Sequence, residues 1–133
     1  MIYLVIIVLL IILVFPYLIY QSKKPSGLIG LWMMKIWNRV YMPMVVWSVS
    51  QLDHKKRFHA ILDVGVGNGA SSKYLKKHFP NSQVLGIDIS STAIRAAEKL
   101  AERGLSFEVK NVEKTNLPFE EFDLITAFQT HFH

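Results

Sequence analysis

The sequence of 133 residues contains no cysteine, which excludes disulfide bonds, thiolate metal sites and a cysteine nucleophile. Acidic residues are nearly absent from its first 60 positions, where Asp53 stands against seven lysines and arginines. The remaining positions carry eight basic and nine acidic side chains, so the net charge of +5 arises in the N-terminal part. Because this basic excess adjoins a long apolar run, anionic lipid headgroups explain it better than a nucleic-acid groove, and no nucleic-acid partner is expected.

Residues 1–22 lack any charged side chain and are predicted to form a transmembrane helix that contacts the lipid bilayer. Twenty helical residues span about 30 Å, the thickness of a bilayer core. Pro16 costs one helix hydrogen bond, which transmembrane helices tolerate. A cleaved signal peptide is disfavoured, because no basic segment precedes the apolar run and no small-residue cleavage site follows it. Lys23 and Lys24 follow the span directly, so the positive-inside rule predicts a single-pass membrane protein whose remaining chain is cytoplasmic.

Residues 23–58 are predicted to form an amphipathic, membrane-proximal helical segment. Lys35 and Arg39 interrupt its apolar stretch, Leu28–Val49, and each costs about 2.5 to 3.5 kcal/mol at a bilayer centre, so a second span is rejected. Pro43 is expected to end or kink the helix, giving two short helices. The Trp and Met residues fit a membrane surface, core packing against the following domain or a substrate entrance, and the sequence does not separate these roles.

A short buried strand, His59–Val64, runs directly into three glycines at alternate positions, Gly65, Gly67 and Gly69. Glycine allows a positive φ and lets the backbone approach a ligand, and the helix that follows presents free N–H groups. That helix is predicted over Ala70–Phe79. The pattern indicates a loop that binds a nucleotide-like ligand.

A second apolar strand, Val84–Ile89, contains Asp88, which lies 21 residues beyond Gly67. In a doubly wound sheet such a carboxylate lies at the carboxyl edge beside the glycine loop, where it can accept both ribose hydroxyls of a nucleoside. The further elements are expected as a helix over Thr92–Arg103, capped by Ser90 or Ser91 and stopped by Gly104, a third strand over Leu105–Val109 and a fourth over Phe122–Phe128. This order predicts an α/β fold with a parallel, doubly wound, Rossmann-like sheet in residues 59–133.

The segment from Ile61 to Gly69 resembles motif I of the class I S-adenosylmethionine-dependent methyltransferases. Further matches follow in the family's order over residues 60–130: Asp88 at the ribose-binding acid, Asn111-Val112-Glu113 at the adenine-contacting loop, and Leu117-Pro118-Phe119 with Phe122-Asp123-Leu124-Ile125 at the run into the fourth strand. Two residues depart from the pattern, since Val66 replaces a small residue or Cys and Asn111 replaces the usual Asp. Asn111 keeps an acceptor and loses the charge, so adenine binding is expected to survive.

The resemblance implies an enzyme that methylates an acceptor with S-adenosyl-L-methionine as its cofactor. By this resemblance Gly65, Gly67 and Gly69 admit the methionine and ribose portions, Asp63 anchors the amino group directly or through water, and Asn111 meets the adenine amine, while Asp88, Ile89 and Val112 complete the predicted binding set. The sequence indicates neither the catalytic residues nor the methyl acceptor. The membrane anchor and the aromatic segment favour a hydrophobic small molecule as acceptor.

A nicotinamide oxidoreductase is one rival function, because Gly65-x-Gly67-x-x-Ala70 also satisfies the dinucleotide fingerprint. Asp63 disfavours it, since a carboxylate two residues before the first glycine would oppose a pyrophosphate and would attract an ammonium group. The methyl donor is therefore the preferred ligand.

A chain that binds the cofactor without catalysis is the other rival function. The family's sheet has seven strands, and four are predicted before His133, so the sequence is expected to be a truncated product or a fragment. Its activity alone is therefore in question. His131 and His133 are interpreted as ordinary histidines near the terminus, and no metal site is expected.

Overall fold

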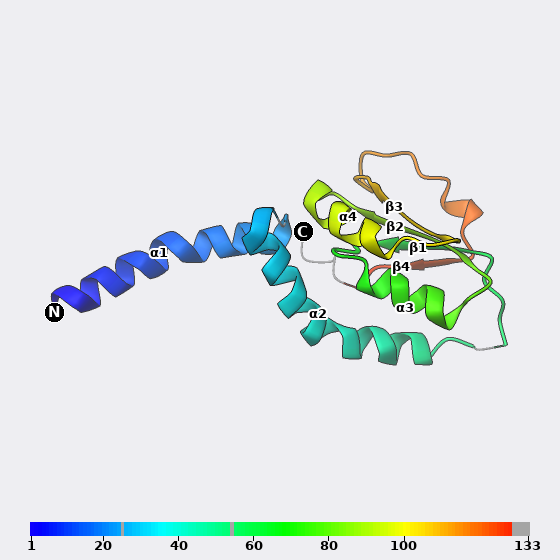
Figure 1. Ribbon diagram of the computed structural model, residues 1–133, viewed down its shortest axis with the longest axis horizontal. Coiled ribbons are helices and arrows are strands. Elements are labelled where there is room, and N and C mark those ends of the chain that lie inside the picture. The colour runs from blue at the N-terminus through cyan, green and yellow to red at the C-terminus, as the bar shows by residue number, and fades with distance from the viewer. Residues whose placement is uncertain (25, 54, 129–133) are drawn as a thin grey trace.

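The computed structural model describes residues 1–24, 26–53 and 55–128 (Figure 1). Two N-terminal helices, α1 (Ile2–Lys23) and α2 (Gly27–Ser50), precede an α/β unit. That unit runs β1 (Ala60–Val64), α3 (Ala70–His78), β2 (Gln83–Asp88), α4 (Ser91–Ala97), the 3₁₀ turn η1 (Glu98–Leu100), β3 (Leu105–Val109), the 3₁₀ turn η2 (Phe119–Glu121) and β4 (Leu124–Thr126). In Figure 1, α1 projects away from the α/β unit, while α2 continues beneath the unit, below α3 in this view.

The four strands form one parallel sheet in the order β3-β2-β1-β4. The chain moves outward from β1 to β2 and β3, and then returns to pair β4 with the other side of β1. Such a reversal is a topological switch point, and ligands of open α/β sheets bind outside the carboxyl ends of the strands there. The predicted Rossmann-like parallel sheet is confirmed, and its switch point lies at the carboxyl end of β1.

Helices α2, α3 and α4 share the core on one face of the sheet. Ile61 of β1 is fully buried there against apolar side chains of all three helices, including Val49 of α2, Leu75 of α3 and Ala97 of α4. On the opposite face, Leu117 from the loop before β4 packs on a smaller apolar cluster of β1 and β2. Of the three roles that the sequence left open for the Trp- and Met-rich segment, core packing therefore applies to one face of α2.

Helix α2 is continuous, with Pro43 inside it, so the expectation of two short helices is wrong. Figure 1 shows the helix changing direction part-way along its length, which is the kink that the sequence also allowed. Proline has no N–H, so Pro43 cannot donate to the carbonyl of Arg39 one turn earlier, and its ring crowds that carbonyl. After the kink, Val45 and Val49 of α2 are buried in the core.

Helix α4 ends earlier than expected. Ser90 caps its start, because the Ser90 hydroxyl accepts from the N–H of Ala93 at 3.2 Å, but the α-helix stops at Ala97 instead of Arg103. Glu102 and Leu105 form a tight antiparallel bridge, in which each donates its N–H to the other's carbonyl, at 3.2 and 2.9 Å. This turn requires the residues before β3 to leave the helix, which local helix propensity does not reveal.

Strand β4 is also shorter than the predicted Phe122–Phe128. The carboxylate of Asp123 accepts from the N–H groups of His59 at 2.5 Å and Ala60 at 3.0 Å, and these backbone hydrogen bonds lower the Asp123 pKa. Asp123 therefore ties the entry of β4 to the entry of β1. Pairing with β1 then covers three residues, Leu124–Thr126.

Candidate functional site

The three alternate glycines form the turn between β1 and α3 at the switch point. Gly65, Gly67 and Gly69 all have positive φ values, of 70°, 54° and 83°, which residues other than glycine rarely adopt. The N–H groups of Gly65 and Val66 donate to the carbonyl of Ile87 at 2.7 and 3.2 Å, so the turn is tied to β2. The loop is therefore a fixed feature of the sheet edge.

Asp88 lies directly across this loop. One carboxylate oxygen accepts from the N–H of Gly67 at 2.9 Å, and the other accepts from the N–H of Ser90 at 2.8 Å. The side chain is partly buried at the end of β2. The structure thus brings together the glycine loop and the acid that the sequence predicts beside it.

Asp63 lies beneath the loop rather than on its surface, with 1% of its area exposed. One carboxylate oxygen accepts from the hydroxyls of Ser71 at 2.6 Å and Ser72 at 2.8 Å, and the other accepts from Thr126 at 2.7 Å. Burial raises the pKa of Asp63, and the three hydroxyl donors partly offset this effect. Asp63 therefore joins β1 to the first turn of α3 and to β4.

The partners of Asp63 were not predicted from the sequence. Ser71 and Ser72 follow the glycine loop in the first turn of α3, so their nearness to the sheet edge could have been a local signal. Thr126 lies 63 residues away in the sequence, and pairing of β4 with β1 places it opposite Asp63.

Gly69 serves close packing in addition to its turn. A Cβ on Gly69 would come within 2.8 Å of the Phe107 ring and 2.9 Å of the Ala97 side chain. Gly86 in β2 is equally tight, since its Cβ would lie 2.6 Å from the same ring. At Gly67, in contrast, the nearest such atom is the Met34 sulfur at 3.8 Å, an ordinary contact distance. Of these glycines, Gly67 is the one with room beside it.

Two apolar side chains are exposed at the carboxyl ends of β2 and β3. Ile89, directly after β2, is 44% exposed, and Val112, after β3, is 37% exposed. Asn111 precedes Val112, and its side-chain oxygen accepts from the N–H of Glu113 at 2.9 Å, which opens a local turn. The predicted adenine-side residues therefore lie at the same edge of the sheet as Asp88.

Helix α2 reaches the glycine loop, which the sequence did not predict. The side-chain amide of Asn38 donates to the side-chain oxygen of Asn68 at 2.6 Å. Met34, one turn earlier, is buried with 5% exposed and lies against Gly67. Helix α2 therefore forms one wall of the candidate site.

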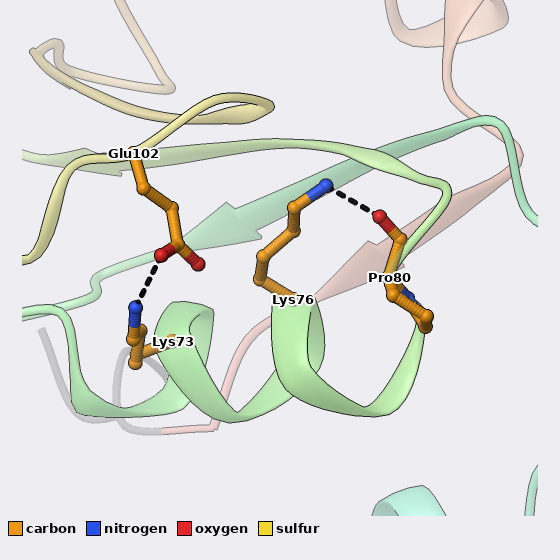
Figure 2. Close-up of polar contacts among 4 residues, drawn as sticks. All are labelled: Lys73, Lys76, Pro80 and Glu102. Atoms are coloured by element: carbon orange, nitrogen blue, oxygen red, sulfur yellow. Dashed lines mark hydrogen bonds and ion pairs between the residues drawn. The ribbon is translucent and has the colours of Figure 1, made fainter.

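An open groove of about 480 Å³ lies along α3 and includes Met42 of α2 in its wall. Figure 2 shows its polar contacts: the Lys73 ammonium pairs with Glu102 at 2.8 Å, and the Lys76 ammonium donates to the Pro80 carbonyl at 2.7 Å. Lys76 also donates to the Ser82 carbonyl at 2.7 Å. These two cations bind the protein itself, so the groove is a weaker ligand site than the loop edge.

Metal ligation finds no support in residues 1–24, 26–53 and 55–128, where no group of three His, Cys, Asp or Glu residues could hold an ion. His131 and His133 lie outside the residues that the structure describes.

Comparison with known proteins identifies the family of this fold and site. The profile described as "Methyltransferase domain" matches residues 61–133, which is more than half of the chain. The chain belongs to this family. The match begins in β1 and includes the glycine loop, Asp88 and Asn111.

Individual relatives agree with this family. The chain is 39% identical over 70 residues to the release factor glutamine methyltransferase of Flavobacterium psychrophilum, covering 50% of this chain and 25% of that protein. It is 31% identical over 94 residues to the tocopherol O-methyltransferase of Arabidopsis thaliana, covering 65% and 26%. A crystal structure of the plantazolicin methyltransferase BpumL with a triazolic analogue and S-adenosylhomocysteine matches with 31% identity and a TM-score of 0.52, covering 66% and 34%.

These comparisons confirm the predicted methyltransferase family, its fold and S-adenosyl-L-methionine as its cofactor. The chain spans about a quarter of the length of the two sequence relatives. Their names give different acceptors, a release factor glutamine and a tocopherol, so the shared segment does not define the acceptor.

Proposed function

We propose that the carboxyl edge of β1 and β2 binds S-adenosyl-L-methionine and that the protein transfers its methyl group to an acceptor. The observation that carries this proposal is the pairing of the Gly67 N–H with the Asp88 carboxylate at 2.9 Å. It places a carboxylate suited to ribose hydroxyls beside a loop that a ligand can approach closely. Both lie at the topological switch point, where such folds bind nucleotides.

The residues at this edge fit the cofactor. Gly67 has a positive φ and no side chain, and a Cβ there would make only an ordinary contact with Met34, so a ligand can lie against its backbone. Ile89 and Val112 expose apolar surface that an adenine ring would cover, and Asn111 has a side-chain amide for its polar edge. Asp63 supports the loop from below through hydrogen bonds with three hydroxyl groups. Asp63 would therefore act on the cofactor's amino group through these hydroxyls, or directly after a local shift of its own side chain.

When bound at this edge, S-adenosyl-L-methionine would supply a methyl group on a positively charged sulfur, which an acceptor atom would take up as it loses its proton. The protein's own contribution is orientation, because correct alignment of two reactants supplies much of the rate enhancement. Asp88 and the loop fix the donor, and α2 closes one side through Met34 and Asn38.

Calorimetric titration of the full chain in detergent micelles tests the cofactor. We expect saturable heat with S-adenosylhomocysteine and none with NADH. Binding of NADH instead would support the dinucleotide rival. Absence of binding heat with both ligands would contradict the proposed cofactor site.

We also propose a three-part organisation: a membrane-spanning segment in residues 1–22, a membrane-proximal helical segment in 23–58 and the methyltransferase part in 59–133. Helix α1 is long and apolar enough to cross a bilayer, and its side chains from Ile2 to Tyr20 are all exposed. Lys23 and Lys24 at its end favour a cytoplasmic methyltransferase part. This organisation favours a hydrophobic small-molecule acceptor.

The absence of cysteine gives a clean test of this topology. Asn81→Cys introduces one thiol in the exposed turn between α3 and β2. In bacterial cells that express the chain, a membrane-impermeant maleimide should label this thiol only after the inner membrane is permeabilised. Labelling in intact spheroplasts would reverse the proposed orientation, and recovery of the chain in the soluble fraction would exclude the anchor.

The acceptor class is tested separately. The full chain in vesicles of total membrane lipid is incubated with S-adenosyl-L-methionine that carries a radioactive methyl group. We expect label in the organic extract of the lipids. Label confined to soluble metabolites or protein would overturn the hydrophobic acceptor, and absence of transfer would contradict catalysis by this chain.

A further inference from the structure

Helix α2 has two faces with different surroundings. Its inner face is buried against the α/β unit and carries Met34, Val45 and Val49. Its outer face carries apolar side chains that are all at least 41% exposed: Ile29, Trp32, Ile36, Val40, Val46 and Trp47. Ile29, Trp32, Ile36 and Val40, which precede the kink at Pro43, recur at spacings of three, four and four, which puts them on one stripe of an α-helix. An apolar stripe of this length has no partner in the described part of the chain.

Two cations lie along one edge of this stripe. Lys35 and Arg39 are four residues apart and both exposed, so they occupy the same side of α2, next to Trp32 and Ile36. A helix with an apolar stripe, tryptophans and flanking cations is typical of one that lies in the plane of an anionic membrane surface.

We propose that this outer face of α2 lies in the headgroup region of an anionic lipid bilayer. The inference rests on the proposed membrane span of α1. Residues 24–26 alone separate α1 from α2, and three extended residues reach about 10 Å. Helix α2 therefore begins at the membrane surface. The bilayer surface is thus the nearest partner that could cover the exposed apolar stripe, and we favour it over another protein.

The same helix contacts the cofactor loop on its inner face. Asn38 hydrogen-bonds Asn68, and Met34 lies against Gly67, while Trp32 and Ile36 point to the outer side. A helix with its side chains is about 10 Å across. The proposed docking thus holds the glycine loop about one helix diameter from the headgroups, within reach of an acceptor whose reactive group lies at that level.

Intrinsic fluorescence tests this proposal, because all three tryptophans of the chain, Trp32, Trp37 and Trp47, lie in α2. The full chain is placed in nanodiscs that contain phosphatidylglycerol, and Trp37→Phe with Trp47→Phe leaves Trp32, which precedes the kink, as the single reporter. We expect lipids brominated near the headgroup to quench Trp32 more strongly than lipids brominated near the chain ends, and aqueous iodide to quench it weakly.

Two outcomes would overturn docking on the bilayer. Strong quenching by iodide with none by brominated lipid would show that the face is exposed to water. Protection from both quenchers would show that a second copy or another protein segment covers it. Binding of S-adenosylhomocysteine is measured on the same nanodiscs, so that failure of the proposed cofactor site is recognised independently of failure to dock.

Charge reversal tests the headgroup contact. Lys35→Glu with Arg39→Glu should reduce quenching by brominated lipid and make it independent of the phosphatidylglycerol content. Lys99→Glu with Arg103→Glu is the matched control, because these residues are also exposed and four apart but lie after α4. Equal effects of the two pairs, or no effect of either, would contradict a specific docking face on α2.

Discussion

The backbone N–H of Gly67 donates to the carboxylate of Asp88 across 2.9 Å, joining the loop after β1 to the end of β2. The second carboxylate oxygen of Asp88 accepts from the N–H of Ser90, which begins the capped turn of α4. One side chain therefore fixes the two backbone segments that form the sheet edge. The proposed cofactor would meet a carboxylate that is already oriented.

Asp88→Asn keeps the shape of the side chain but removes its charge. We expect the affinity for S-adenosylhomocysteine to fall by roughly 10- to 100-fold, since a hydrogen bond to a charged group contributes about 1.5 to 3 kcal/mol. Isothermal titration calorimetry in detergent measures this change. Glu98→Gln, an exposed carboxylate in η1, serves as the charge-matched control. Unchanged affinity in Asp88→Asn would exclude Asp88 from the cofactor site.

Asn38→Ala tests the wall that α2 contributes. It removes the 2.6 Å hydrogen bond to Asn68, and a neutral hydrogen bond contributes about 0.5 to 1.5 kcal/mol. We expect S-adenosylhomocysteine affinity to fall by up to about tenfold because the loop is held less firmly. Asn116→Ala, at an exposed position before η2, should bind normally. If both variants bind with native affinity, α2 does not support the loop.

Gly86→Ala tests the close packing behind the loop. The added Cβ would lie 2.6 Å from the Phe107 ring, so we expect a loss of about 1 to 3 kcal/mol in the free energy of unfolding. Phe107→Leu removes the ring and should relieve this clash. In a double-mutant cycle, measured by chemical denaturation in micelles, the double variant should therefore lose less free energy of unfolding than the two single variants lose together. Simple additivity would contradict the packing.

Asp63→Asn tests the buried carboxylate through its pH dependence. Because the folded-state pKa of Asp63 is raised above 3.8, the folded chain binds this proton more tightly than the unfolded chain. The resulting stabilisation is fully present below pH 3.8 and is lost as the pH rises through the raised pKa. The amide that replaces the carboxyl group does not titrate, so the variant should gain stability relative to the native chain over this pH range. A difference in free energy of unfolding between the variant and the native chain that is the same at every pH would contradict the prediction.

Local sequence patterns were sufficient for the elements that form the sheet edge. The apolar run before the glycines predicted β1, and the second apolar run predicted β2 with Asp88 at its end. These predictions depend on residues close together in the chain, whose alternation, glycine content and polarity dictate backbone conformation directly. The ends of α4 and β4 were not predicted correctly. The turn at Glu102 and the contacts of Asp123 with the start of β1 set these ends against the local propensity.

The sequence by itself determined an apolar N-terminal helix, a glycine loop between two strands, a carboxylate beside that loop and membership of a methyltransferase family. Only the tertiary structure decided that Asp63 is buried under three hydroxyls and that α2 reaches the loop. The Asn38–Asn68 contact joins residues 30 apart, and the Thr126–Asp63 contact joins residues 63 apart. These contacts depend on how the helices and strands pack against one another, and no local sequence pattern encodes that packing.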